Sequence, residues 1–169
     1  MAHITIYGIT DSEEFSHLED TDFCDDTYAH DHYDGWRNRE EDPKVLAEEL
    51  SNLFSDSDRT RITVGEDAFG WYIEFTQEAI DLYFLSLYSA FRNHVCDLMK
   101  VMEPDMMKVG YIPALWGAEH VFSDDTGSML FDWTNGWLTP QDFMRLVEPG
   151  VRYYITGAVD AHCWKERAS

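Results

Sequence analysis

The stretch Arg61–Met102, RITVGEDAFGWYIEFTQEAIDLYFLSLYSAFRNHVCDLMKVM, decides the fold class. Its β-branched and aromatic runs at Arg61–Val64 and Trp71–Phe75 predict two paired strands. A long helix is then predicted over about Gln77–Met102, and its apolar residues wrap much of the circumference, which is typical of a helix at the buried centre of a fold. Two adjacent strands followed by a helix do not repeat the alternation of a doubly wound sheet, so they favour an α+β fold.

The rest of the chain completes this architecture. The other predicted elements are a strand at His3–Ile9, a helical turn near Ser12–Leu18, a helix over Pro43–Phe54, a hairpin of 116–122 and 128–133, a short helix between Pro140 and Glu148, and a strand at Val151–Val159. We expect a mainly antiparallel sheet of about five to six strands, packed on a long central apolar helix and two shorter helices. With 169 residues, the chain is predicted to form a single domain, 1–169, with an acidic insert at about 10–42.

Cysteine usage and hydropathy indicate a soluble protein of the cytoplasm, or of the host cytoplasm if a phage encodes it. The three cysteines are widely spaced and form no CxxC pair, which argues against a disulfide framework or a zinc ribbon. The start of the chain does not resemble a signal peptide. The most apolar stretch, around Ile80–Met102, carries charged residues and is not expected to cross a membrane.

Acidic residues dominate the charge, and they are unevenly distributed. The net charge is −21, from 33 acidic and 12 basic residues. The acidic segment, which we define as Asp11–Asp58, holds 17 acidic residues and three basic ones, a net charge of −14. Direct binding to nucleic acid or to an anionic membrane is therefore disfavoured, whereas a basic protein surface is the natural complement. A protein adapted to high salt would spread its acids more evenly.

Apolar side chains are interleaved with these acids, and they are expected to hold the carboxylates against the domain. The apolar residues are Phe15, Leu18, Phe23, Tyr28, Tyr33 and Trp36. Like charges placed this close repel one another, a cost that a basic partner would relieve. The predicted partner-binding residues are Glu13, Glu14, Glu19, Asp20, Asp22, Asp25, Asp26, Asp31, Asp34, Trp36, Glu40 and Glu41.

His30 and His32 are weak candidates for a metal site. Two histidines in an extended His-x-His segment can face one metal ion, with an aspartate or Cys24 completing the ligand set. The spacing fits no zinc module, and no calcium loop or nucleophile motif is present. We therefore expect no catalytic residue and no cofactor, and an enzyme is the less favoured class.

The function favoured by the sequence is that of an acidic inhibitor that occupies the nucleic-acid-binding surface of a partner, such as a nuclease. In charge and size the chain resembles the DNA-mimic class used by phages and mobile elements as anti-CRISPR or anti-restriction proteins. The alternatives are an immunity protein that neutralises a nuclease toxin, a metal-dependent enzyme built on His30 and His32, a halophilic protein, and a solvated acidic loop without a partner. A homodimer is compatible with all of them.

Overall fold

A computed structural model describes residues 2–25, 29, 33–54, 62–100, 115, 117–118 and 129–163. Over these residues the architecture is α+β, with a mixed, mainly antiparallel sheet and three helices. The fold class and the mainly antiparallel sheet are as the sequence predicts, but the sheet has seven strands and not the predicted five to six. The strands are β1 (Ala2–Thr10), β2 (Tyr33–Asn38), β3 (Ile62–Glu66), β4 (Trp71–Phe75), β5 (Met129–Asp132), β6 (Gly136–Leu138) and β7 (Arg152–Cys163). The helices are α2 (Pro43–Phe54), α3 (Gln77–Lys100) and α5 (Pro140–Leu146), together with a 3-10 turn, η1 (Asp20–Phe23).

The long strand β7 organises the sheet. The strand order is β3-β4-β7-β1-β5-β6, and β2 also pairs with β7. β7 is antiparallel to β1, β2 and β4, whereas β5 lies parallel to β1. Between Gly8 and Ile9 the register of β1 against β7 shifts, so that Thr156 becomes an extra residue in β7. Such a bulge changes which face the following side chains of a strand occupy.

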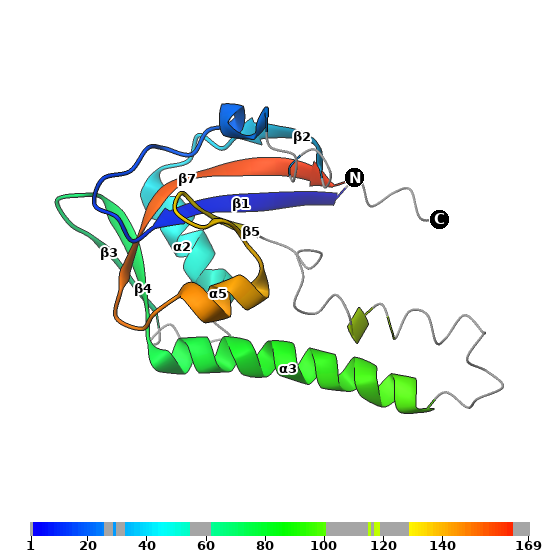
Figure 1. The fold of residues 1–169 in the computed structure, drawn as a ribbon. Coiled ribbons are helices and arrows are strands. Elements are labelled where there is room, and N and C mark those ends of the chain that lie inside the picture. The colour runs from blue at the N-terminus through cyan, green and yellow to red at the C-terminus, as the bar shows by residue number, and fades with distance from the viewer. Residues whose placement is uncertain are drawn as a thin grey trace.

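The two faces of the sheet carry separate cores. On one face, Tyr7, Ile9 and Ile155 pack with buried residues of α2 and α5. On the other face, Ile6 and Val159 pack with Leu18 and Phe23, which belong to the chain between β1 and β2. Figure 1 shows η1 on one side of β1 and β7, with α2 and α5 on the other.

The helices α2 and α5 begin where the sequence predicts. In α5, the Thr139 hydroxyl accepts a hydrogen bond from the Asp142 N–H at 3.0 Å, and Pro140 occupies the first turn. Phe54 of α2 stacks on Phe143 of α5, with ring centroids 4.8 Å apart.

The predicted position of the long helix is wrong. Only Ala79 and Ile80 of α3 are buried, and Figure 1 shows the helix running beneath α5 and away from the strands. Its large apolar side chains include several that are exposed. An apolar pattern around a helix indicates that a covering surface would be favourable, but it does not specify that this surface is the core of the same chain.

Three local predictions also differ from the structure. Residues near Ser12–Leu18 are irregular, and the helical turn comes later, at η1. Residues 33–38 fall in the acidic insert, where no strand is predicted, yet they form β2 by pairing with β7. Gly117 and Ala118 are helical, so they do not form the predicted hairpin, and β5 pairs with β6 and β1. The predicted turn at 123–127 lies outside the described residues.

Candidate functional site

The candidate site is built on Asp11–Asp25, which we call the anchored segment. It contains seven acidic residues and neither lysine nor arginine. Five predicted partner-binding residues in it have exposed side chains, and together they form what we call the acidic surface: Glu13, Glu14, Glu19, Asp22 and Asp25. None of the five forms an ion pair among the residues that the structure describes. Asp11, which was not predicted, is exposed beside them.

Leu18 attaches the middle of the anchored segment to the sheet. Its side chain is buried, and its backbone N–H donates to the carbonyl oxygen of Thr156 at 2.9 Å. The neighbouring strand residues are Gly8 and Gly157, which face each other across β1 and β7. A Cβ atom would lie 2.9 Å from Leu18 Cβ if placed on Gly8 and 2.8 Å from the Leu18 carbonyl oxygen if placed on Gly157. The paired glycines thus allow the backbone of Leu18 to approach the sheet.

Phe23 attaches the end of η1 through an aromatic cluster. Its ring is buried and stacks on Trp137 at a centroid distance of 4.9 Å. Phe131 and Trp36 meet the same ring edge-on, at 5.7 and 6.4 Å. Edge-on and offset ring pairs of this kind are favourable beyond the apolar area that they bury. Tyr33 is also buried here, so the predicted anchoring by Leu18, Phe23 and Tyr33 is confirmed, while Tyr28 lies outside the described residues.

Hydrogen bonds hold η1 in place between these two anchors. The Glu19 backbone N–H donates to Asp22 Oδ2 at 2.7 Å, and Asn38 of β2 bonds both the backbone N–H and the carboxylate of Asp20. Earlier in the segment, Phe15 stacks on Tyr154 of β7, with ring centroids 5.9 Å apart. The backbone that carries the carboxylates between these contacts is therefore held against the sheet.

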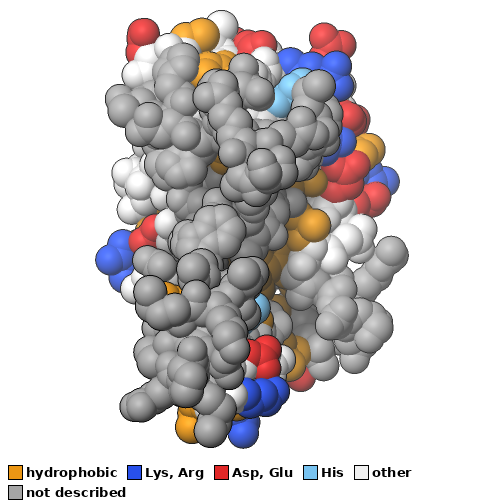
Figure 2. All heavy atoms as spheres, turned by 90° about the vertical axis from the view of Figure 1, so that its right-hand side faces the viewer, with side chains coloured by type: hydrophobic (Ala, Val, Ile, Leu, Met, Phe, Trp, Pro, Cys, Tyr) orange, Lys and Arg blue, Asp and Glu red, His pale blue; other side chains and the backbone are white. Residues whose placement is uncertain are grey.

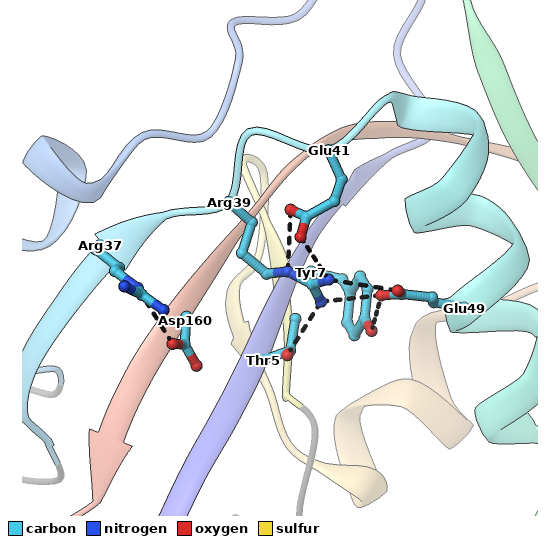
Figure 3. Close-up of polar contacts among 7 residues, drawn as sticks. All are labelled: Thr5, Tyr7, Arg37, Arg39, Glu41, Glu49 and Asp160. Carbon is cyan, nitrogen blue, oxygen red and sulfur yellow. Dashed lines mark hydrogen bonds and ion pairs between the residues drawn. The ribbon is translucent and has the colours of Figure 1, made fainter.

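Arginine neutralises a different group of acids, next to β2. Arg39 uses all five of its N–H donors, which form hydrogen bonds of 2.9–3.3 Å to the carboxylates of Glu41 and Glu49 and to the hydroxyl of Thr5 (Figure 3). The Tyr7 hydroxyl also donates to the Glu49 carboxylate, at 3.2 Å. Hydrogen bonds from Arg39 lower the pKa of Glu41. Burial and the nearby Glu49 carboxylate raise the pKa of Tyr7. Of the predicted partner-binding residues, Glu41 is thus already paired within the chain.

The other two basic residues of the acidic segment are also paired. Arg37 lies 3.4 Å from Asp160, and Lys44 lies 4.0 Å from Glu48. Arg37, Arg39 and Lys44 thus all pair with acids outside the anchored segment, so none of the three neutralises the acidic surface. On the side of the molecule where β1 begins and β7 ends, by contrast, the described atoms include acidic and basic side chains together (Figure 2).

The remaining predicted site residues have mixed outcomes. Trp36 is half-buried in the aromatic cluster around Phe23, and Glu40 is exposed beside Arg39. Asp26 and Asp31, the side chain of Asp34, and both histidines of the candidate metal site lie outside what the structure describes. Within the described part, no three His, Cys, Asp or Glu side chains are grouped so that they could hold a metal ion.

The sequence did not predict two contacts of the anchored segment. Gly8 and Gly157 lie opposite each other beneath Leu18, and Asn38 forms hydrogen bonds with Asp20. A glycine inside a predicted strand often marks the close approach of another backbone, and both glycines lie in predicted strands. That signal alone does not show that the two glycines face each other, because their pairing depends on strands at opposite ends of the chain.

Comparison of the chain with protein-family models, with curated proteins and with solved structures gave no match. Within the described ranges, no helix combines the length and apolarity that crossing a membrane requires.

Proposed function

We propose that the protein is an acidic inhibitor that binds the basic, nucleic-acid-binding surface of a partner protein in the cytoplasm. The observation that carries this proposal is the acidic surface: five exposed carboxylates, without an ion pair to any described residue, on a segment held to the sheet by buried Leu18 and Phe23. A basic groove that binds nucleic acid is built to accept closely spaced negative charges.

The anchoring of the segment favours binding over mere solubility. A disordered acidic tail must lose conformational entropy when it binds, whereas carboxylates fixed beforehand lose less. Mutual repulsion among the carboxylates destabilises the free protein. A basic partner would relieve that repulsion, and attraction between the opposite charges would accelerate association.

The experiment begins by identifying a partner. The purified protein is immobilised, a nuclease-treated lysate of the native host is passed over it, and bound proteins are eluted with increasing salt and identified by mass spectrometry. We expect a nucleic-acid-binding protein that elutes at moderate salt, because screening weakens interactions between exposed charges. That protein is then purified and bound to labelled duplex DNA, and the present protein should displace the DNA.

Failure to displace DNA would contradict inhibition at the nucleic-acid-binding surface, even if the two proteins form a complex. Elution that does not depend on salt would contradict the electrostatic basis of the complex.

A further inference from the structure

Helix α3 has one face that packs on the molecule and one whose large apolar side chains are exposed. Ile80 is buried, and the half-buried Tyr83, Leu87 and His94 follow it along the same side. Gly117 lies against the His94 ring, since a Cβ atom on Gly117 would be 2.5 Å from it. At 3.6 residues per turn, these residues define the inner face of the helix.

The outer face carries large apolar side chains. Leu85, Tyr88 and Met99 are 52%, 47% and 81% exposed, and the rings of Phe84 and Tyr88 stack with centroids 6.0 Å apart. Helical geometry places this stripe opposite His94. Exposed apolar patches on one side of a helix usually mark a binding surface.

The spacing along the outer face is that of a helix-pairing seam. Steps of three and four residues connect its positions, as in the seven-residue repeat of a coiled coil. Acidic residues lie at the beginning of this seam and arginine lies further along it. In chain order the seam positions are Glu78, Asp81, Leu85, Tyr88, Arg92, Val95 and Met99; of these, Val95 is half-buried and the others are exposed.

We propose that two copies of the chain pair through the outer faces of their α3 helices in antiparallel orientation. Antiparallel alignment of Asp81 with Arg92 of the second copy brings Leu85 opposite Tyr88 and Glu78 opposite Val95 of that copy, and the same contacts repeat across the twofold axis. Met99 lies beyond the paired part of the two helices. Parallel pairing would instead place Asp81 against Asp81. Both charged side chains are exposed, and Arg92 forms no ion pair with any described residue.

The total charge sets the salt dependence of this dimer. Each copy carries a net charge of −21, so long-range repulsion opposes association at low ionic strength, and added salt screens it. Self-association should therefore strengthen between low and moderate salt, whereas binding to a basic partner should weaken. The dimer does not depend on the proposed function, and the opposite salt trends separate the failure of one proposal from the failure of the other.

Analytical ultracentrifugation over a concentration series at moderate salt tests the pairing. The expected mass of the wild-type protein approaches twice 19.7 kDa at high concentration. Asp81→Arg places two arginines in contact and Arg92→Asp places two aspartates in contact, so each single variant should be monomeric. The double variant should dimerise again, and an equimolar mixture of the two single variants should form a heterodimer. Asp97→Arg, on the side of α3 away from the seam, should leave dimerisation unchanged.

A wild-type protein that stays monomeric at every concentration would overturn the proposal. Single variants that dimerise like the wild type would also overturn it, since the contact would then lie elsewhere. Restored dimerisation in the mixture would exclude misfolding as the cause of dissociation in the single variants.

Discussion

The backbone of Leu18 lies directly on Gly157 of β7. The Leu18 N–H bonds the carbonyl oxygen of the preceding residue, Thr156, at 2.9 Å. Gly157 has a φ angle of +145°, which is unfavourable for residues with a side chain. The anchored segment therefore depends on the absence of a side chain in the strand beneath it.

Gly157→Ala should destabilise the protein by about 1–3 kcal/mol, because the new Cβ meets the Leu18 carbonyl oxygen and the backbone angle becomes strained. Urea unfolding measures the change in the free energy of unfolding. Gly35→Ala is the matched control, since a Cβ atom there meets nothing within 4 Å, and we expect a change within about 0.5 kcal/mol. Equal effects of the two substitutions would contradict the contact with Leu18.

Phe23→Ala should cost about 3–5 kcal/mol, because it removes a buried ring and leaves a cavity among the aromatic residues. Phe69→Ala provides a comparison in which the ring is 48% exposed, and a loss below about 1 kcal/mol is expected.

Phe23→Leu retains most of the apolar volume. If this milder variant folds but binds the partner more weakly at unchanged net charge, fixed positioning of the carboxylates contributes to affinity. Unchanged affinity in a variant whose anchored segment has become protease-sensitive would show that positioning is unimportant.

Arg39→Met should destabilise the protein by about 1–2 kcal/mol, because Glu41 and Glu49 lose charge-assisted hydrogen bonds while remaining close together. The Arg39 side chain is only 19% exposed, whereas that of Arg37 is 75% exposed and forms one ion pair among the described residues. Arg37→Met should therefore change the free energy of unfolding by less than about 0.5 kcal/mol. Thermal unfolding of both variants checks this order, and a larger effect at Arg37 would contradict it.

The ion pair between Arg39 and Glu41 also predicts a dependence of stability on acid. The pKa of Glu41 in the folded protein is below its ordinary value of 4.5, so the stabilisation is present above pH 4.5 and is lost as the pH falls through the lowered pKa. Glu41→Gln should reduce the loss of unfolding free energy below pH 4.5. Glu40→Gln removes the same charge one residue earlier and controls for the general relief of repulsion by acid. Identical pH profiles of these two variants would refute the role of the pair.

Local patterns in the sequence predict much of the fold. The alternation at His3–Ile9 and the helix starts at Pro43 and Pro140 depend on neighbouring residues, and all three elements form. β2 depends on pairing with β7, which lies more than 100 residues further along the chain. The local sequence pattern of residues 33–38 is weak and therefore predicts no strand. The apolar pattern of α3 predicts a helix, but whether its outer face is covered by the same chain is a tertiary property.

For the candidate site too, some features follow from the local sequence and others depend on tertiary contacts. The exposure of the acidic residues and the burial of Leu18 and Phe23 follow from polarity. The close approach of Leu18 to Gly8 and Gly157 depends on the register between β1 and β7, which lie far apart in the sequence. The arginine contacts also depend on tertiary structure: Arg39 pairs with Glu49 of α2, and among the described residues no arginine pairs with the acidic surface.

The central claim is tested most directly by neutralising the acidic surface and measuring how well the protein displaces DNA from its purified partner. The first variant is E13Q/E14Q/E19Q/D22N/D25N. The matched control is D42N/E48Q/E66Q/D97N/E148Q, whose carboxylates are exposed outside the anchored segment and outside the α3 seam; each set removes five charges, from −21 to −16. We predict that the control displaces DNA like the wild type, while the first variant is weaker by more than about tenfold, or about 1.4 kcal/mol. Equal displacement by the two variants would contradict the account, because net charge rather than this surface would then govern binding.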